Sequence, residues 1–181
     1  MIVEEIYLKG AYLLKPNVIN DERGCFMETF NAEKFRREIG FLPEFVQDNQ
    51  SRSKKGVLRG LHFQKGAYAQ AKLIQVIKGE VLDVIVDIRE NSETFGEYYK
   101  VILNDISHEQ LYIPRGFAHG FVALSDEVIF SYKCDNFYHK DAESGIAYDD
   151  EFLNIDWEFP TEEMIISSKD KLLPSFKELF S

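Results

Sequence analysis

The sequence predicts an all-β fold, a small β-barrel or jelly roll with small peripheral helices. Strand-forming runs recur along the chain and are separated by turn signals at 21–24, 78–79, 104–105 and 125–126. The segment 81–88 alternates apolar and polar residues, as a strand with one buried face does. The aromatic content is high, with 15 Phe, 9 Tyr and 1 Trp, which suits a β-rich interior.

Nine segments have the composition and length of strands. They are 10–14, 25–30, 57–63, 72–78, 81–88, 98–103, 110–113, 120–124 and 128–134. In 81–88 the face with Leu82, Val84 and Val86 is expected in the core. Asp83 lies on the other face, which either meets solvent at the surface or lines a polar cavity.

Two helices are expected at the periphery. Asn31 can cap a helix that carries Phe35 and Ile39 four residues apart and ends at Gly40. The tail 174–180 predicts a second, closing helix. The acidic segment Asp149–Glu163, which contains Trp157 and Pro160, is expected to be irregular.

The length of 181 residues fits one domain spanning 1–181. The formal net charge of −10 argues against nucleic acid or an anionic membrane as partner, but a few convergent cations still allow an anionic small ligand. Cys25 and Cys134 form no CxxC pair, which indicates reduced thiols in a cytoplasmic protein, and both are expected as small core residues. No signal peptide and no apolar run of ~20 residues is found.

The segment GVLRGLHFQ, from Gly56 to Gln64, places polar residues inside an apolar strand that follows turn-type residues. Arg59 and His62 supply a cation and a base that titrates near neutral pH. Gly60 between them is expected as a bulge that aims both into one cavity. The alternative is that His62 is a hydrogen-bonded core histidine and Arg59 a surface cation.

Three further residues can take part in proton chemistry. Lys72 shares a strand face with inward-pointing residues, so it either points into a cavity or is turned outward by a bulge. Tyr132 is expected to bury its ring, and its hydroxyl either serves the site or bonds to backbone. His119 lies between Gly116 and Gly120, either close to a ligand or simply in a turn.

The sequence lacks the signatures of several other enzyme classes. A metal-binding barrel would offer His-x-His followed by Glu and a later His, whereas Phe63 and Gln64 follow His62. There is no Gly-x-Ser-x-Gly, P-loop or dinucleotide fingerprint. We therefore expect neither a metal nor a cofactor.

Several motifs occur together in a recognisable order. They are DERGCFMETF from Asp21, QDNQSRS from Gln47, GVLRGLHFQ, QAKLIQVIKGEVLDVIVDIR from Gln70, SETFGEY from Ser92, YIPRGFAHGF from Tyr112, YKCDNFYHKDAESGI from Tyr132 and SSKDK from Ser167. On these motifs nearly the whole chain resembles the RmlC family, the dTDP-4-dehydrorhamnose 3,5-epimerases. The resemblance implies a cupin-type β-barrel that works without a metal.

The resemblance also implies roles for individual residues. His62 is similar to the family's general base, and Asp170 to the carboxylate that orients its ring. Tyr132 resembles the acid that returns a proton on the opposite face, and Lys72 the cation beside the 4-keto oxygen. These roles agree with the chemistry, since epimerisation beside a ketone needs a base, an acid and a donor for the enolate oxygen.

By the same resemblance, the residues expected to hold the nucleotide sugar are Arg23, Phe26, Glu28, Gln47, Asp48, Asn49, Arg59, His119, Tyr138, Glu143 and Lys169. Tyr138 would stack on thymine. The family is usually a homodimer that exchanges an N-terminal strand, so Arg23, Phe26 and Glu28 are expected to serve the neighbour's site. Tyr148 stands where the family commonly has Trp, and Gln75 where it often has Arg or an aromatic residue.

The implied activity is inversion of C3 and C5 of dTDP-4-dehydro-6-deoxy-D-glucose, on the way to dTDP-L-rhamnose for cell-surface polysaccharide. Three alternatives stay open: an epimerase of C3 only or C5 only, a 3,4-ketoisomerase on a similar barrel, and a non-catalytic nucleotide-sugar-binding barrel. The number of inverted carbons depends on how the sugar turns in the site.

Overall fold

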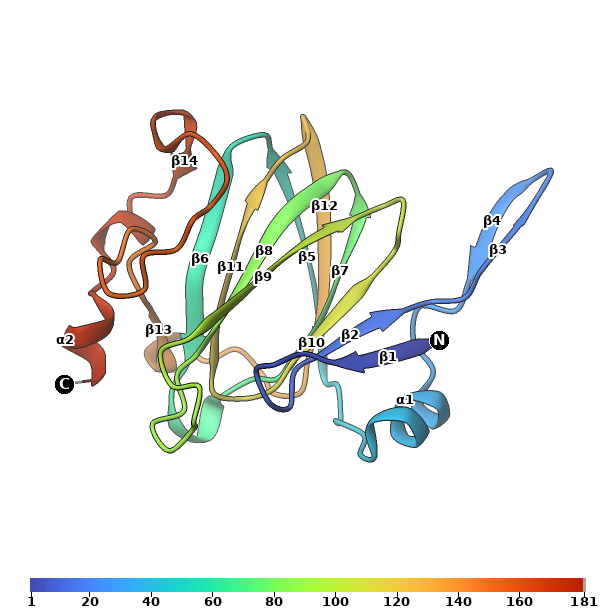
Figure 1. The fold of residues 1–181 in the computed structure, drawn as a ribbon, viewed down its shortest axis with the longest axis horizontal. Helices are drawn as coiled ribbons and strands as arrows, with labels where there is room; N and C mark the ends of the chain where they lie inside the picture. Colours follow the sequence, from blue (N-terminus) through green and yellow to red (C-terminus); the bar gives the residue numbers. More distant parts are fainter. Residues whose placement is uncertain (181) are drawn as a thin grey trace.

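The computed structural model describes residues 1–180 and contains two large antiparallel sheets that face each other (Figure 1). The first sheet has the order β1 (Ile2–Glu5), β2 (Tyr12–Lys15), β10 (Gln110–Ile113), β7 (Lys72–Lys78), β12 (Glu127–Cys134), β5 (Gln47–Lys54). The second has the order β13 (Glu143–Gly145), β6 (Val57–Gln64), β11 (Phe117–Ala123), β8 (Glu80–Asp87), β9 (Tyr98–Asn104), and β14 (Ile165–Ile166) pairs in parallel with β6. The predicted all-β class is confirmed.

The pairing of the strands refines the predicted barrel or jelly roll, because the two described sheets are not closed into a barrel. Among residues 1–180 no paired strands join the two sheets, so the strands form a two-sheet sandwich. The consecutive strands β5 and β6 belong to different sheets, and side chains of both line the cavity described below. Because β5 and β6 belong to different sheets, the space between them is open for that cavity.

The core has three apolar clusters, and β8 contributes to two of them. Val81 and Ile85 pack between the sheets, against residues such as Ile74 and Phe130 of the first sheet. Leu82, Val84 and Val86 pack on the opposite side of the second sheet against the C-terminal segment, which includes Trp157 and Phe176. The face that carries Asp83 therefore points into the space between the sheets, and its surface alternative is wrong.

The helix α1 (Ala32–Ile39) confirms the prediction made from its ends. The Asn31 side chain accepts a hydrogen bond of 3.0 Å from the Lys34 backbone N–H, and Gly40 ends the helix in the left-handed conformation. Phe35 is the buried residue of the helix and anchors the third cluster, with Leu73 and Tyr112 of the first sheet. The helix thus covers one end of the first sheet.

The C-terminal region is irregular until α2 (Phe176–Phe180), which confirms the expected closing helix. Short 3-10 turns lie at Gly66–Tyr68, Lys140–Ala142, Thr161–Glu163 and Asp170–Leu172. The segment between residues 149 and 163 has no strand, as its composition predicted. None of the described helices has the length and hydropathy of a membrane span.

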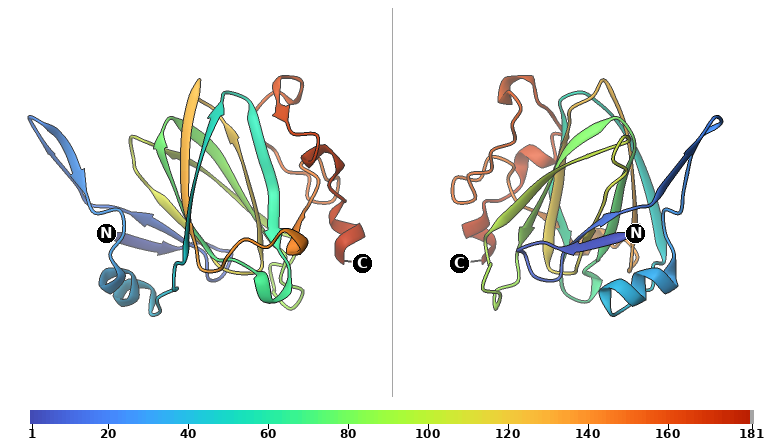
Figure 2. Two further views of the ribbon diagram at one scale, coloured as in Figure 1. Left: turned by 180° about the vertical axis from the view of Figure 1, so that it is seen from behind. Right: turned by 45° about the vertical axis from the view of Figure 1, so that its right-hand side comes forward.

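Strands β3 (Val18–Asp21) and β4 (Gly24–Met27) form a separate hairpin that projects away from both sheets (Figures 1 and 2). It carries two exposed apolar side chains, Ile19 and Phe26, the latter 70% exposed. Cys25 also lies exposed here, so its expected place in the core is wrong, whereas Cys134 is fully buried. The hairpin has no apolar core of its own.

Gly60 marks an irregularity in β6, as expected. The register between β6 and β11 shifts between His119 and Phe121, opposite this glycine. Gly60 has φ +131°, and a Cβ atom there would lie 2.4 Å from the Gly120 Cα. The two backbones therefore approach each other at a point where no side chain fits.

Candidate active site

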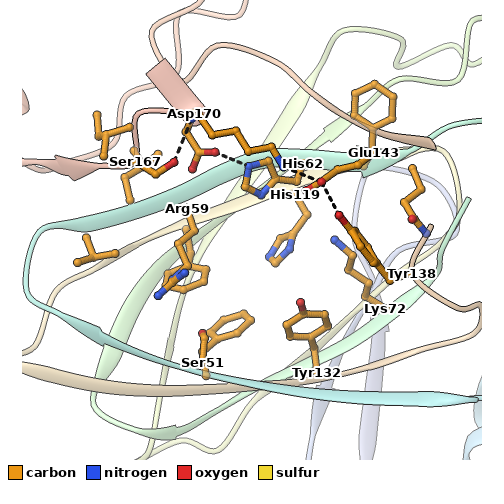
Figure 3. Close-up of a pocket in the computed structure, with 18 of the residues that line it drawn as sticks. Ser51, Arg59, His62, Lys72, His119, Tyr132, Tyr138, Glu143, Ser167 and Asp170 are labelled. Atoms are coloured by element: carbon orange, nitrogen blue, oxygen red, sulfur yellow. Dashed lines mark hydrogen bonds and ion pairs between the residues drawn. The ribbon is translucent and has the colours of Figure 1, made fainter. Parts of the chain in front are cut away.

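A cavity of about 510 Å³ lies between the two sheets (Figure 3). Its walls come from β5 and β12 on one side and β6 and β11 on the other, and the segment from β14 to Asp170 closes one end. Lining residues predicted from the sequence are Arg59, His62, Lys72, His119, Tyr132, Tyr138, Glu143, Lys169 and Asp170. Side chains from distant parts of the chain thus converge on one space.

His62 and Asp170 are in contact although 108 residues separate them. The His62 Nε2 lies 2.8 Å from Asp170 Oδ1, and the carboxyl group is 6% exposed. The Ser167 hydroxyl accepts a hydrogen bond from the Asp170 backbone N–H and fixes the turn that presents the carboxylate. When the Asp170 carboxylate accepts a hydrogen bond from the Nε2–H, the lone pair of the neutral ring lies on His62 Nδ1.

Lys72 and Tyr132 enter the cavity from neighbouring strands of the opposite sheet. Cys134 is the cross-strand partner of Lys72, so Tyr132, two residues earlier, lies on the same face and diagonal to the lysine. The Lys72 Nζ lies 5.8 Å from the centre of the Tyr132 ring. Figure 3 shows the Tyr132 hydroxyl pointing into the cavity, toward the side that carries His62.

Burial acts on these two groups in opposite directions. Desolvation lowers the pKa of the Lys72 ammonium, because the cavity disfavours its charged form. Desolvation raises the pKa of the Tyr132 phenol, which therefore keeps its proton at neutral pH. The strand pattern allowed Lys72 either to point into a cavity or to be turned outward by a bulge. In the structure it points into the cavity.

His119 is the direct cross-strand partner of His62. Its Nε2 lies 2.8 Å from Oδ2 of Asp83, which is fully buried. Desolvation lowers the pKa of His119, and Asp83 only partly opposes this effect. His119 is therefore neutral at neutral pH, and Asp83 accepts a hydrogen bond from its Nε2–H.

Tyr138, Glu143 and Lys169 form a polar group at the mouth of the cavity. Glu143 accepts a hydrogen bond of 2.8 Å from the Tyr138 hydroxyl and pairs with the Lys169 ammonium at 2.6 Å. Tyr138 is 53% exposed, and its backbone N–H donates to the Gln47 side chain. An exposed aromatic face beside a cation is suited to a ring and an anion of one ligand.

Arg59 is held at the other end of the cavity. Its Nε donates to the Ser53 hydroxyl at 3.1 Å, and its outer nitrogen donates to the Arg52 carbonyl at 3.3 Å. Ser51 lines the cavity next to it. The guanidinium keeps further donors available for an anion.

Some predicted residues do not line the cavity. Asn49 and Gln47 face inward on β5, but they bond to Cys134 and to Tyr138 respectively. Asp48 points to the outer face of the same strand and pairs with Lys133, so its predicted contact with the ligand is not supported within this chain.

Arg23, Phe26 and Glu28 lie on or beside the projecting hairpin, and the structure does not bring them to this chain's cavity. Arg23 pairs with Asp21, and Glu28 pairs with Lys34 at 2.7 Å. Within residues 1–180, no three His, Cys, Asp or Glu side chains are grouped to hold a metal ion.

The sequence did not identify every residue of the site. Asp83 was noticeable as a polar residue in an apolar strand, but its hydrogen bond to His119 could not be predicted. Ser51 lies in a segment expected as a turn, which instead belongs to β5 (Gln47–Lys54). Phe121 and Phe130 line the cavity as a stacked pair 4.3 Å apart, yet in the sequence they look like ordinary core residues.

Two antiparallel sheets around a cavity with a histidine–aspartate pair, a lysine and a tyrosine define the class as a proton-transferring isomerase. The sequence model described as dTDP-4-dehydrorhamnose 3,5-epimerase matches residues 5–178. A relative of that name from Methanothermobacter thermautotrophicus is 52% identical over 91% of this chain and 88% of its own. The chain belongs to the dTDP-4-dehydrorhamnose 3,5-epimerase family.

Solved structures agree with this assignment. The dTDP-4-dehydrorhamnose 3,5-epimerase from Elizabethkingia anophelis is 52% identical, with a TM-score of 0.94 over 98% of this chain and 97% of that one. The RmlC epimerase from Legionella pneumophila, in complex with dTDP-4-keto-L-rhamnose, is 43% identical, with a TM-score of 0.94 over 99% and 94% of the two chains. The fold is thus the cupin-type fold of these epimerases.

Proposed function

We propose that this chain inverts C3 and C5 of dTDP-4-dehydro-6-deoxy-D-glucose in dTDP-L-rhamnose biosynthesis, in the cytoplasm and without a metal or cofactor. The names of its relatives support this substrate assignment, and the Legionella structure contains dTDP-4-keto-L-rhamnose, the corresponding product. The observation that carries the proposal is the position of His62 and Tyr132 on opposite sheets of one cavity, with Lys72 beside the tyrosine.

In this proposal His62 Nδ1 removes the proton from the carbon next to the 4-keto group. Asp170 holds the other ring nitrogen at 2.8 Å and favours the imidazolium that forms. The 6% exposure of its carboxyl group strengthens this electrostatic effect, because water does not screen it. One inversion leaves His62 protonated and Tyr132 as a phenolate. The enzyme returns to its starting state when His62 releases its proton to water and Tyr132 takes one up from water.

The enolate oxygen is proposed to lie against Lys72. Negative charge grows on the 4-oxygen as the C–H bond breaks, and a preorganised ammonium stabilises it more than it stabilises the ketone. Tyr132 then delivers a proton to the other face of the planar enolate carbon. Its raised pKa is consistent with this role, since the phenol is protonated when the enolate forms.

The mouth of the cavity is suited to the nucleotide. Tyr138 would stack on thymine and Lys169 would pair with the diphosphate there, despite the net charge of −10 of the whole chain. Arg59 would supply further donors to the diphosphate from the other end of the cavity. We propose that the projecting hairpin exchanges with that of a second copy and adds Arg23, Phe26 and Glu28 to the partner's site. The exposed Ile19 and Phe26 support such a homodimer.

The test is hydrogen exchange in heavy water, followed by NMR at C3 and C5 of the sugar. Wild type is expected to incorporate deuterium at both carbons and to form the doubly inverted product. His62→Asn should lower exchange at both by at least ~100-fold, and Tyr132→Phe should lower inverted product by at least ~100-fold. Both variants should still bind dTDP in calorimetry.

Matched controls are His108→Asn and Tyr99→Phe, whose side chains do not line the cavity. They should turn over like wild type. Label at one carbon only would reject the double epimerase in favour of a C3 or C5 epimerase, and a 3-keto product would identify a ketoisomerase. Binding of dTDP without exchange above background would leave only a binding protein.

A further inference from the structure

Asp83 and Asp87 lie four residues apart on β8 and both are fully buried. Their carboxylates differ in the number of hydrogen bonds that they accept. Both oxygens of Asp87 accept hydrogen bonds, from Arg89, Ser92 and Thr94. Asp83 has one oxygen bonded to His119, whereas its Oδ1 has no hydrogen-bond partner among the described residues. A buried carboxylate oxygen without a donor is costly unless a cation faces it.

His119 cannot be that cation. Burial lowers its pKa, so the ring that bonds Asp83 is neutral at neutral pH. The neutral ring supplies a hydrogen bond but no charge. The negative charge of Asp83 therefore requires another partner in the space between the sheets.

Inside the mouth, two cations of residues 1–180 line the cavity between the sheets, and of these Arg59 is held at one end by Ser53 and the Arg52 carbonyl. The other is Lys72, on which the charge of Asp83 acts together with Cys134 and Glu143. Cys134 does not supply a negative charge, since burial raises the pKa of its thiol to about 11. Glu143 lies at the mouth and is already paired with Lys169 at 2.6 Å. Tyr132 is a protonated phenol, and the neighbouring His62 is bonded to Asp170. Asp83 is therefore the remaining group that can supply the negative charge next to Lys72.

We infer that Asp83 is a positioning residue of the site: one oxygen fixes the ring of His119, and the other is the counter-charge that keeps Lys72 a cation inside the cavity. The inference rests on the proposed function, in which Lys72 must be charged when the enolate forms. Without Asp83 the lysine would lose its proton at lower pH and could no longer stabilise the 4-oxygen.

The test is the titration of Lys72 in Asp83→Asn, read by NMR of protein labelled with ¹³C at the lysine ε-carbons. The signal is assigned by its absence in Lys72→Met. Asparagine keeps an acceptor for His119 and removes the charge, so the Lys72 midpoint is expected to fall by about 1 pH unit or more. In kinetics, kcat should begin to decline at correspondingly lower pH, while the affinity for dTDP is retained.

Asp87→Asn is the matched control, because it removes an equally buried carboxylate from the same strand. It should leave the Lys72 midpoint unchanged. An unchanged midpoint in Asp83→Asn, or an equal shift in Asp87→Asn, would overturn the inference. Wild type without epimerase activity would instead overturn the proposed function, and the NMR titration would still decide the role of Asp83.

A second variant covers the case in which Asp83→Asn does not fold. Removing both charges in Lys72→Met/Asp83→Asn should restore folding relative to the single variant, because an uncharged pair replaces a single buried charge. The measurement is the urea midpoint of the single and double variants. A double variant that unfolds at the same or lower urea than Asp83→Asn would show that the two groups are not partners.

Discussion

Asp87 shows how strongly a single buried carboxylate can be stabilised. Burial alone would raise its pKa, but the guanidinium of Arg89 and the hydroxyls of Ser92 and Thr94 overcome this and lower it from 3.8 to about 2. These donors all lie in the loop that connects β8 to β9. The carboxylate therefore fixes the conformation of this loop at the lower end of the second sheet.

We predict that Asp87 stabilises the fold by about 2 kcal/mol at neutral pH. Its folded pKa lies below its unfolded pKa, so this contribution is present above about pH 4 and is lost as the pH falls toward 2. Asp87→Asn should therefore unfold at lower urea than wild type at pH 7, and the gap should narrow near pH 2. The exposed Asp126→Asn should leave stability unchanged at both pH values.

The site residues differ in how far the sequence could predict them. Motifs identified His62, Tyr132 and Asp170, and the structure brings these residues to one cavity. Their roles in the reaction stay predictions until the variants are assayed. Asp48 was also predicted as a ligand contact, and this stays a prediction. Strand alternation turns its side chain away from this chain's cavity, which a motif without a known strand cannot reveal.

At the scale of elements, the close approach of β6 and β11 at Gly60 sets the position of His62. We predict that Gly60→Ala lowers the free energy of unfolding and abolishes exchange at C3 and C5. An added Cβ would lie 2.4 Å from the Gly120 Cα and 2.9 Å from the His119 carbonyl oxygen, so the strands would have to separate.

The matched control is Gly24→Ala in the hairpin. Gly24 has φ +126°, close to the +131° of Gly60, but nothing lies within 4 Å of its added Cβ. Both variants carry similar backbone strain, and only Gly60→Ala adds a clash. Urea unfolding should show Gly60→Ala less stable than Gly24→Ala by about 2 kcal/mol. Equal losses would mean that the close approach is not important for stability.

Strand β5 explains why part of the fold was not predicted. Its sequence, QDNQSRSK, has no apolar residue, and only its end, with Ser51, Ser53 and Lys54, was interpreted, as turn-type residues. Its inward face meets a polar cavity and not a hydrocarbon core, so the usual alternation of apolar and polar residues is missing. In β8, by contrast, the predicted core face is confirmed, because Leu82, Val84 and Val86 are buried in an apolar cluster. The other face also carries core residues, Val81 and Ile85. The capped helix α1 needed no tertiary information and was predicted correctly.

For the molecule as a whole, the proposed exchange would make the hairpin β3–β4 part of the partner's site. We predict that Arg23→Ala and His62→Asn, each poorly active alone, recover activity when the two chains are unfolded and refolded together. A mixed dimer with exchanged hairpins has one site with an intact His62 from one chain and an intact Arg23 from the other. Turnover at low substrate, measured against refolded single variants, tests this.

The control mixes His62→Asn with Lys72→Met, two changes in the same cavity. No exchange of hairpins can rebuild that site, so activity should not return. Recovery in the control, or none with Arg23→Ala, would mean that the hairpin serves its own chain or no site at all. Sedimentation of wild type should show a dimer of this 21.0 kDa chain.

The pairing of His62 with His119 on adjacent strands also affects how hydrogen moves during turnover. A positive charge on the first ring discourages one on the second, because like charges repel strongly where water is scarce. In the proposed mechanism, the imidazole that captures hydrogen from the sugar therefore has no neighbouring histidine to pass it to. That hydrogen must return to the same carbon or leave for the solvent, so an isotope found in the product records an exchange with bulk water and not a reservoir inside the protein.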